Sequence, residues 1–524
     1  MLTEPLYTVS QQDRFLEKAA NVASIVLGGG CVASLLALLY FLYHYSWTRE
    51  RKFDSPMGVV LYYLVPAGVA ALFFASLKLT ARYKINLAIL SVSLAASAIG
   101  VEVFLQLSSP LAPKLAVWQV QGQSEEKKQR TREFARQYGV DFDTRDAIEI
   151  LRDLRKSGVE AVPNVSRWLD IKNNLWNWQP DGTIQSAVKI AGEEVIPLGA
   201  VANGTTILCN EGGQWITYLS DEHGFSNPKG IYDSEPLDIG VLGDSFAQGF
   251  CVPPDSSSVA LIRQRYPATL NLGIAGNGPL LELATLKEYL SSLKPRHVLW
   301  FYYEGNDLTG LRTEKKIPLV MRYLKGDFSQ GLVSRQHEID QALRGLIDSK
   351  MAETMNQPPP RRNWFSNGLS KLVGIVALSS LRQRLGLVQG KTSHESEMLS
   401  DLNGPNMDLF GQIMMEAKSC VNAWGGTLHF VYLPSFSRYF GSPEVGVGMR
   451  ARVLSAVSSL VIPVIDINTT FQAHGDVSSF FPWGGYGHYN AKGHRVVAEE
   501  VLKAIDPSGR SVRTFSASSR VRVD

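Results

Sequence analysis

The sequence predicts an α/β protein in which three transmembrane helices and a small mixed α/β segment precede a three-layer α/β/α domain with a five-stranded parallel sheet. Two observations lead to this fold class. Three long apolar runs lie near the N-terminus, and from Leu237 onward short apolar runs alternate with helical patterns. The chain has 524 residues, 45% of them hydrophobic, so it is too long for one ordinary soluble domain and too apolar for a disordered chain.

Residues 1–110 have the composition of a membrane anchor. Each apolar run reaches the roughly 20 residues that a helix needs to cross about 30 Å of hydrocarbon. Helices inside a soluble protein normally keep a polar stripe, which these runs almost entirely lack. A lipoprotein cleavage site fits poorly, because Gly28 stands where an aliphatic residue is expected and the run continues past Cys31. The three predicted spans cover 23–47, 57–77 and 85–107.

Basic residues set the expected orientation of this anchor. With the N-terminus inside, five basic residues fall on the inner side and four on the outer side, which favours that arrangement. Everything after residue 107 then lies on the far side of the bilayer. The lipid bilayer itself is the first partner that the sequence predicts. A nucleic acid is not expected as a partner, since 52 basic and 49 acidic residues give no concentrated basic face.

Residues 111–236 form a predicted juxtamembrane connector followed by a small mixed α/β lead-in. The stretch 114–138 is polar and charged, as expected for a solvated connector. A helical pattern over 145–157 and short alternating runs follow it, and none of these residues forms a recognisable catalytic pattern.

Residues 237–506 predict the α/β domain. Continuous apolar runs are typical of buried parallel strands, and helical patterns between them are typical of doubly wound folds. Asn490 is a favourable N-cap for the last helix. In such folds the chemistry lies beyond the carboxyl ends of the strands. The predicted strands cover 238–242, 269–272, 297–303, 427–433 and 461–467, and the predicted helices 280–293, 407–424, 449–460 and 491–505.

An insertion at 309–405 interrupts this alternation. It contains a proline-rich stretch and a short apolar helix candidate over 369–378. A segment this long inside a compact domain is usually functional or partly disordered. A lid, or a surface that rests on the bilayer, is one interpretation, and a packed insertion is the other. The tail, 507–524, is expected to be disordered.

Residues that suit ester cleavage stand at the ends of the first three strands and before the last helix. The reaction needs a nucleophilic hydroxyl, a base that takes its proton, and donors for the oxyanion. Ser245 suits the first role and His488 the second. The backbone N–H groups of Ser245 and Gly276 and the side-chain amide of Asn306 suit the third. Each signal is weak alone, so the prediction depends on their order along the chain.

These blocks resemble those of the SGNH (GDSL) hydrolase family over roughly residues 237–505. The resemblance implies Ser245 as nucleophile, His488 as general base, and Gly276 and Asn306 as oxyanion donors. A stretch at the end of the lead-in also resembles that of envelope-associated members. The matching residues are Gly243-Asp244-Ser245 for the first block, Gly276 for the second, Gly305-Asn306-Asp307 for the third and His488 for the fifth.

One residue of the family pattern is missing. The family usually places an aspartate three residues before the catalytic histidine, where this chain has Gly485, and no carboxylate lies between Phe480 and His488. A backbone carbonyl can orient the imidazole, a carboxylate such as Asp476 can arrive from elsewhere, or activity can be lost. Removal of the orienting acid costs ~10⁴ in rate yet leaves substantial catalysis. We therefore favour an active Ser–His dyad.

The other polar residues indicate no further chemistry. Asp244 and Asp307 are expected to support their loops by accepting backbone hydrogen bonds. His223 and His429 have no metal-ligand partners at useful spacing, so we expect no metal and no other cofactor. A phosphate-binding loop and a Gly-x-Ser-x-Gly elbow are both missing from the sequence. One disulfide can form among the last three of the four cysteines, Cys209, Cys251 and Cys420.

The leading prediction is a membrane-anchored serine esterase or acylhydrolase that removes, or transfers, an O-acyl group on a cell-envelope glycan or lipid. The resemblance to tethered bacterial members suggests the inner membrane, with the catalytic domain on the extracytoplasmic side. Three spans are few for moving an acyl donor across the bilayer, so hydrolysis is favoured. The alternative is a weakly active or inactive SGNH-like module that binds a glycan or supports an envelope polysaccharide pathway. The sequence predicts no oligomeric state.

Overall fold

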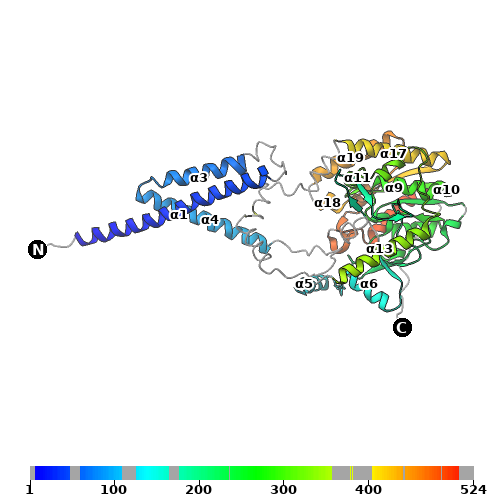
Figure 1. The fold of residues 1–524 in the computed structure, drawn as a ribbon, viewed down its shortest axis with the longest axis horizontal. Helices are drawn as coiled ribbons and strands as arrows, with labels where there is room; N and C mark the ends of the chain where they lie inside the picture. The colour runs from blue at the N-terminus through cyan, green and yellow to red at the C-terminus, as the bar shows by residue number, and fades with distance from the viewer. Residues whose placement is uncertain are drawn as a thin grey trace. The chain divides into compact units, whose positions relative to one another are not determined.

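A computed structural model of the chain divides into two compact units (Figure 1). The helical unit comprises Met1–Pro110 and Asn363–Gly390, and the α/β unit comprises Leu111–Arg362 and Lys391–Asp524. The predicted tail, 507–524, lies outside the described residues. The structure describes residues 6–47, 60–108, 125–164, 176–234, 236–356, 378, 381, 404–440, 443–485 and 487–506.

In the helical unit, α1 packs against α3 and α4 around Ala23, Leu27 and Ala88 (Figure 1). Most of the other apolar side chains described on these helices are exposed. Leu381 of the same unit donates its backbone N–H to Oε2 of Glu102 in α4 at 2.7 Å. The helices are α1 (Leu6–Trp47), a π-helical segment (Val60–Leu64), α3 (Val65–Ser76) and α4 (Ala81–Ser108).

Two of the three predicted spans correspond to helices that are long and apolar enough to cross a membrane. These are Asp13–Leu42 within α1 and Ala81–Phe104 within α4. The second predicted span, 57–77, is observed as the π-helical segment followed by the 12-residue helix α3, and residues 57–59 lie outside the described residues. The structure therefore supports two candidate spans, and the third remains a prediction.

The α/β unit is built around a five-stranded parallel sheet of order β12-β11-β10-β8-β9. The sheet confirms the predicted α/β domain with its five parallel strands, and every predicted strand overlaps an observed one. In the chain, β9 follows β8 and lies at the edge of the sheet, whereas β10 lies on the other side of β8. The direction of winding therefore reverses between β8 and β10, and sheets of this kind bind ligands at such a point. The strands are β8 (Ile239–Gly243), β9 (Thr269–Asn271), β10 (His297–Tyr303), β11 (Thr427–Leu433) and β12 (Val464–Asp466).

Helices cover both faces of this sheet and make the domain three-layered. Successive side chains of a strand point to opposite faces, so Leu242 and Val241 belong to two different buried clusters. The cluster around Leu242 includes side chains of α9 (Pro279–Thr285), α17 (Pro405–Ala423) and α19 (Pro443–Ser459). The cluster around Val241 includes those of α8 (Ser258–Arg265) and α21 (Ala491–Ile505).

The last helix, α21, begins where the sequence predicts. Oδ1 of Asn490 accepts the backbone N–H groups of Lys492 at 3.0 Å and of Gly493 at 3.1 Å. These are N–H groups that the first turn of a helix leaves without an internal partner. The cap fixes the start of the helix and, directly before it, the loop that carries His488.

The lead-in segment packs against the α/β domain instead of standing apart from it. Its side chains Val162, Ile184 and Val201 lie in the same buried cluster as Leu242. Its main sheet has order β1-β6-β7, and two short hairpins accompany it. The elements are α5 (Glu125–Arg136), α6 (Ala147–Lys156), β1 (Ala161–Pro163), β2 (Trp176–Trp178), β3 (Ile184–Ser186), β4 (Lys189–Ile190), β5 (Glu193–Glu194), β6 (Thr205–Cys209) and β7 (Ile216–Leu219).

The first part of the predicted insertion, 309–405, is a packed part of the domain. Ile339 and Leu343 of its long helix are buried in the cluster around Leu242. The apolar helix candidate, 369–378, lies outside the described residues apart from its last residue. The helices here are α11 (Asp307–Glu314), α12 (Pro318–Met321) and α13 (Gln336–Asn356).

Candidate active site

The first sheet strand presents Ser245 at its carboxyl end. β8 ends at Gly243, Asp244 is the N-cap, and Ser245 opens the short helix α7 (Ser245–Gln248). Gly243 has a φ of +149°, and a Cβ at this position would lie 2.8 Å from the Cβ of Ala247. Only glycine fits this conformation and this space. The chain can therefore turn sharply from strand to helix at the sheet edge.

His488 lies directly against the Ser245 hydroxyl. Its Nε2 is 2.9 Å from Oγ of Ser245, although the two residues are 243 positions apart in the chain. The imidazole ring contacts Phe246 and Phe250, with ring centroids 4.9 and 4.7 Å away. Ser245 is 5% exposed and the His488 side chain 21%. The structure thus brings the two predicted residues together in a pair that is largely shielded from water.

Asn306 joins this pair through Asp244. Oδ2 of Asp244 accepts a hydrogen bond from Nδ2 of Asn306 at 3.0 Å and lies 3.4 Å from Oγ of Ser245. The amide and the hydroxyl are therefore neighbours at one carboxylate oxygen. An amide nitrogen carries two hydrogens. The bond to Asp244 uses one of them and orients the group, and the second is a candidate donor to an oxyanion.

Gly276 lies in the turn after β9, as the sequence indicates. Its φ is +81°, a conformation that glycine adopts without strain. The turn is fastened to the helix that Ser245 opens, because the N–H of Ala275 donates to Oε1 of Gln248 at 3.0 Å. The loop that carries Gly276 is therefore adjacent to α7.

Asp244 and Asp307 each hold a loop of the site. Oδ1 of Asp244 accepts the N–H of Phe246 at 2.9 Å, and Oδ2 of Asp307 accepts the N–H of Tyr303 at 2.8 Å. Both carboxyl groups are fully buried, and this burial raises the pKa of each. Their contacts are those of loop supports, the role that the sequence suggests for them.

The second nitrogen of His488 faces Glu211, a residue that the sequence reasoning missed. Nδ1 of His488 is 2.7 Å from Oε1 of Glu211, and the backbone N–H of His488 donates to Oε2 at 2.8 Å. The orienting group is thus neither a backbone carbonyl nor Asp476. Asp476 is exposed and accepts the hydroxyl of Ser478 at 2.7 Å. The interpretation of a dyad without a carboxylate is corrected by this contact.

A disulfide links the loop of Glu211 to the block of Ser245. Cys209, at the end of β6, is bonded to Cys251, with 5.4 Å between the Cα atoms. Cys420 is a free thiol. The sequence left the pairing among these three cysteines open, and the structure has one bridge, between Cys209 and Cys251. The pair of cysteines is the sequence signal that could have found Glu211. Cys251 lies six residues after Ser245, so a bridge to Cys209 puts the lead-in beside the nucleophile.

The surroundings of His488 favour its protonated form. Burial by itself lowers the pKa of the imidazole, but the charge and hydrogen bond of Glu211, together with the charge of Asp244, outweigh it and raise the pKa above its ordinary value. An imidazole that is more basic than usual is a stronger proton acceptor, which general-base catalysis uses. The electrostatic setting therefore matches the role that the sequence assigns to His488.

Three potential metal-ligand groups lie close together here. The candidate ligand atoms of Glu211, Cys251 and His488 are within 4.8 Å of one another, the one such set among the described residues. Each of them already has another partner, because the Cys251 sulfur is in the disulfide and both nitrogens of His488 face protein oxygens. A metal ligand set needs free thiolate and imidazole donors, so these contacts suit acid–base chemistry better.

Comparisons with known proteins found similar solved structures, whereas no family model and no curated protein matches the chain. A lipolytic protein of the G-D-S-L family from Desulfitobacterium hafniense, described as putative, is 12% identical, covers 51% of this chain and 99% of its own, and has a TM-score of 0.27. A lipase/acylhydrolase from Enterococcus faecalis is 13% identical, with 52% and 96% covered and a TM-score of 0.27.

A psychrotrophic esterase from Pseudoalteromonas sp. is 10% identical, covers 52% of this chain and all of its own, and has a TM-score of 0.27. These proteins are described as lipolytic or esterase proteins, and each matches about half of this chain. At such identities and TM-scores the function of this protein has to be argued from the geometry of its own site.

Proposed function

We propose that the protein is a membrane-anchored serine esterase that cleaves an O-acyl ester through a covalent acyl-enzyme. The observation that carries this proposal is the contact of 2.9 Å between Oγ of Ser245 and Nε2 of His488, at the carboxyl edge of the sheet. A buried serine hydroxyl beside an imidazole, with a side-chain amide next to it, is the arrangement that acyl transfer requires.

In the proposed reaction, Oγ of Ser245 attacks the ester carbonyl while Nε2 of His488 takes the hydroxyl proton. The tetrahedral oxyanion is stabilised by the N–H groups of Ser245 and Gly276 and by Nδ2 of Asn306. The carbon–oxygen bond to the leaving alcohol then breaks, and His488 returns the proton to that alcohol. Water, activated by the same imidazole, cleaves the acyl-serine and restores the free hydroxyl.

The substrate that we propose is an acylated glycan or lipid of the bacterial cell envelope. Two candidate membrane spans support an anchored enzyme, since they would hold the catalytic unit close to such a substrate. The disulfide between Cys209 and Cys251 supports an extracytoplasmic catalytic unit, because disulfides persist in oxidising compartments. Hydrolysis and transfer share the same acyl-enzyme and differ in whether water or a sugar hydroxyl accepts the acyl group.

A fluorophosphonate probe tests this proposal on the full chain in detergent. We expect covalent labelling of the wild type, none of Ser245→Ala, and p-nitrophenyl acetate hydrolysis that is lost in the same variant. The variant Ser478→Ala, at a half-buried serine, serves as the matched control and should label normally. Folded wild-type protein that neither labels nor hydrolyses the ester would contradict an enzyme and favour the glycan-binding module.

A further inference from the structure

We infer that Glu211 is the positioning residue for His488, and that the lead-in segment thereby completes the active site of the α/β domain. This inference rests on the proposed serine-esterase function and adds a third member to its machinery. Its basis is the contact of both carboxylate oxygens of Glu211 with one residue, His488.

The two contacts fix both the position and the tautomer of the imidazole. Oε2 of Glu211 holds the backbone of His488 at 2.8 Å, and Oε1 faces Nδ1 of the ring at 2.7 Å. A carboxylate can only accept hydrogen bonds, so Nδ1 must carry the proton. Nε2 then presents its lone pair to Oγ of Ser245, which is the state that a general base needs.

The carboxylate also compensates the charge that forms during the reaction. When His488 takes the proton of Ser245, an imidazolium appears in a largely buried place, where an uncompensated charge is costly. The Glu211 side chain is 4% exposed, so its charge is weakly screened by water. Since the carboxylate is already in contact with the ring, the charge pair forms without rearrangement.

Two restraints hold Glu211 in this place, and the backbone before His488 approaches its carboxylate closely. The disulfide of Cys209 ties the chain two residues before it. Nε1 of Trp483, in the turn before His488, donates to the backbone carbonyl of Glu211 at 2.6 Å. A Cβ at Gly487 would lie 3.0 Å from Oε2 of Glu211, so the backbone beside the catalytic histidine approaches the carboxylate closely.

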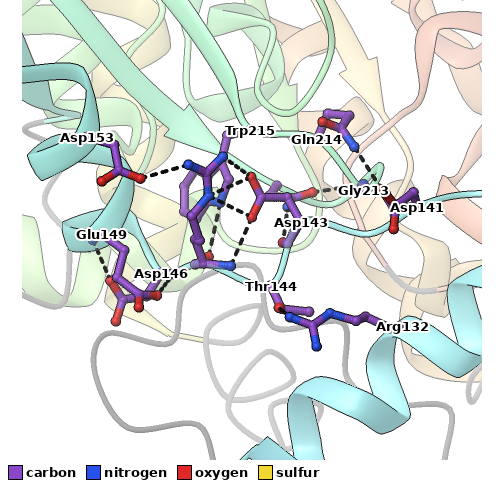
Figure 2. A network of polar contacts seen from close by, with 12 residues as sticks. Arg132, Asp141, Asp143, Thr144, Asp146, Glu149, Asp153, Gly213, Gln214 and Trp215 are labelled. Atoms are coloured by element: carbon purple, nitrogen blue, oxygen red, sulfur yellow. Dashed lines mark hydrogen bonds and ion pairs between the residues drawn. The ribbon is translucent and has the colours of Figure 1, made fainter. Parts of the chain in front are cut away.

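The chain on both sides of Glu211 is bound to the first residues of the lead-in, Asp141 and Asp143 (Figure 2). Asn210 donates its side-chain amide to the carbonyl of Asp143 at 2.8 Å. The N–H of Asp143 donates to the carbonyl of Gly213 at 2.8 Å. The amide of Gln214 donates to the carbonyl of Asp141 at 2.8 Å. The loop that carries the carboxylate is thus clamped by segments far from Ser245 in sequence, as expected for a group that must be held in one orientation.

The test compares three variants of Glu211 in the full chain, with p-nitrophenyl acetate as substrate over a range of pH. In Glu211→Gln the side-chain carbonyl must take the backbone N–H of His488, so its NH₂ group faces Nδ1 and forces the wrong tautomer. We expect kcat to fall 10²- to 10⁴-fold. Glu211→Ala leaves Nδ1 to water, so we expect a smaller loss than in Glu211→Gln, and Glu211→Asp should recover part of the rate.

The pH profile separates positioning from mere structural support. The activity of the wild type should rise with pH as His488 loses its proton, and loss of the negative charge in Glu211→Gln lowers the pKa of His488, so the acid limb should move to lower pH. A variant that is only less well folded would lose activity without moving the limb. Asp476→Asn is the matched control, and both its kcat and the position of its acid limb should equal those of the wild type.

The inference is overturned if Glu211→Gln retains more than a third of the wild-type kcat, or if its rate falls with an unchanged acid limb. If the wild type is active, either result would be compatible with the serine-esterase function. It would mean that Glu211 supports the fold and does not position the His488 imidazole. An inactive wild type that also fails to label would instead remove the proposed function itself. The two failures are therefore distinguishable.

Discussion

At the scale of single residues, the chemistry depends on a few atoms around Asp244. Its Oδ2 accepts a hydrogen bond from the amide of Asn306 and lies near the hydroxyl of Ser245. Its Oδ1 caps the helix that begins at Ser245. One buried carboxylate thus aligns the predicted nucleophile and a predicted oxyanion donor. Both oxygens of Asp244 accept hydrogen bonds, and an asparagine in its place would offer only one acceptor oxygen.

We predict that Asn306→Ala lowers kcat for p-nitrophenyl acetate about 10²- to 10³-fold, because one oxyanion donor is lost. KM should change little, since the oxyanion exists only in the transition state. Steady-state kinetics on the detergent-solubilised chain measure both constants. A loss that appears only in KM would mean that Asn306 binds the ground-state substrate and does not stabilise the oxyanion.

The sequence could predict Ser245 and His488 but not Glu211, and the reason is distance along the chain. Ser245 and His488 stand in short blocks next to a strand and a helix, where a resemblance can be recognised. Glu211 lies 277 positions before His488, and the one signal near it, Cys209, points to the site only once its bridge to Cys251 is known. Its role exists only through packing of the lead-in on the α/β domain.

At the scale of elements, the sheet could be predicted well and the anchor less so. Strands buried on both faces form continuous apolar runs, so β10 and β11 were predicted with their observed ends. The second span was predicted from apolar composition alone, which does not show where a helix breaks. The observed helical geometry changes from a π-helical segment to an α-helix inside that run.

The disulfide between β6 and the Ser245 block should control both stability and activity. The two cysteines are 42 positions apart, and closing a loop of this length contributes on the order of 4 kcal/mol in the chain-entropy account. We predict that the double variant Cys209→Ser, Cys251→Ser melts at lower temperature and hydrolyses p-nitrophenyl acetate more slowly, because Glu211 is less restrained. Cys420→Ser, at a free thiol, is the control. Unchanged activity in the double variant would show that the other restraints suffice.

The amino ends of β10 and β11 should make the fold sensitive to acid. Nδ1 of His297 is 3.1 Å from Nε2 of His429, and burial, with the charge of His297, lowers the pKa of His429 to about 4. A histidine that resists protonation when folded contributes stability above its ordinary pKa, and this contribution is lost as the pH falls toward 4. The loss amounts to about 2 kcal/mol by pH 5.

We therefore predict that the melting temperature falls further between pH 7.5 and pH 5 in the wild type than in His429→Gln. The exposed His474 provides the control, since His474→Gln should follow the wild type. Thermal melts of the solubilised chain at the two pH values measure the difference. Equal losses in wild type and His429→Gln would contradict a buried neutral histidine at this position.

At the scale of the whole molecule, the number of spans decides where the chain ends lie. With three spans the two chain ends would lie on opposite sides, and the basic residues favour the N-terminus inside, whereas the two candidate spans alone would put both ends on one side. We predict three spans, so a reporter fused at the N-terminus should be cytoplasmic and one at the C-terminus extracytoplasmic. Reporters that are active on the same side would contradict the third span.

The most direct measurement of the central claim is the rate at which a fluorophosphonate labels Ser245 as a function of pH. In the wild type we predict a rate that rises with pH and has its midpoint above about 6.5, the ordinary pKa of histidine, because the surroundings raise the pKa of His488. In His488→Gln the rate should fall by at least 10²-fold and lose this dependence. Labelling of His488→Gln at the wild-type rate would contradict the account.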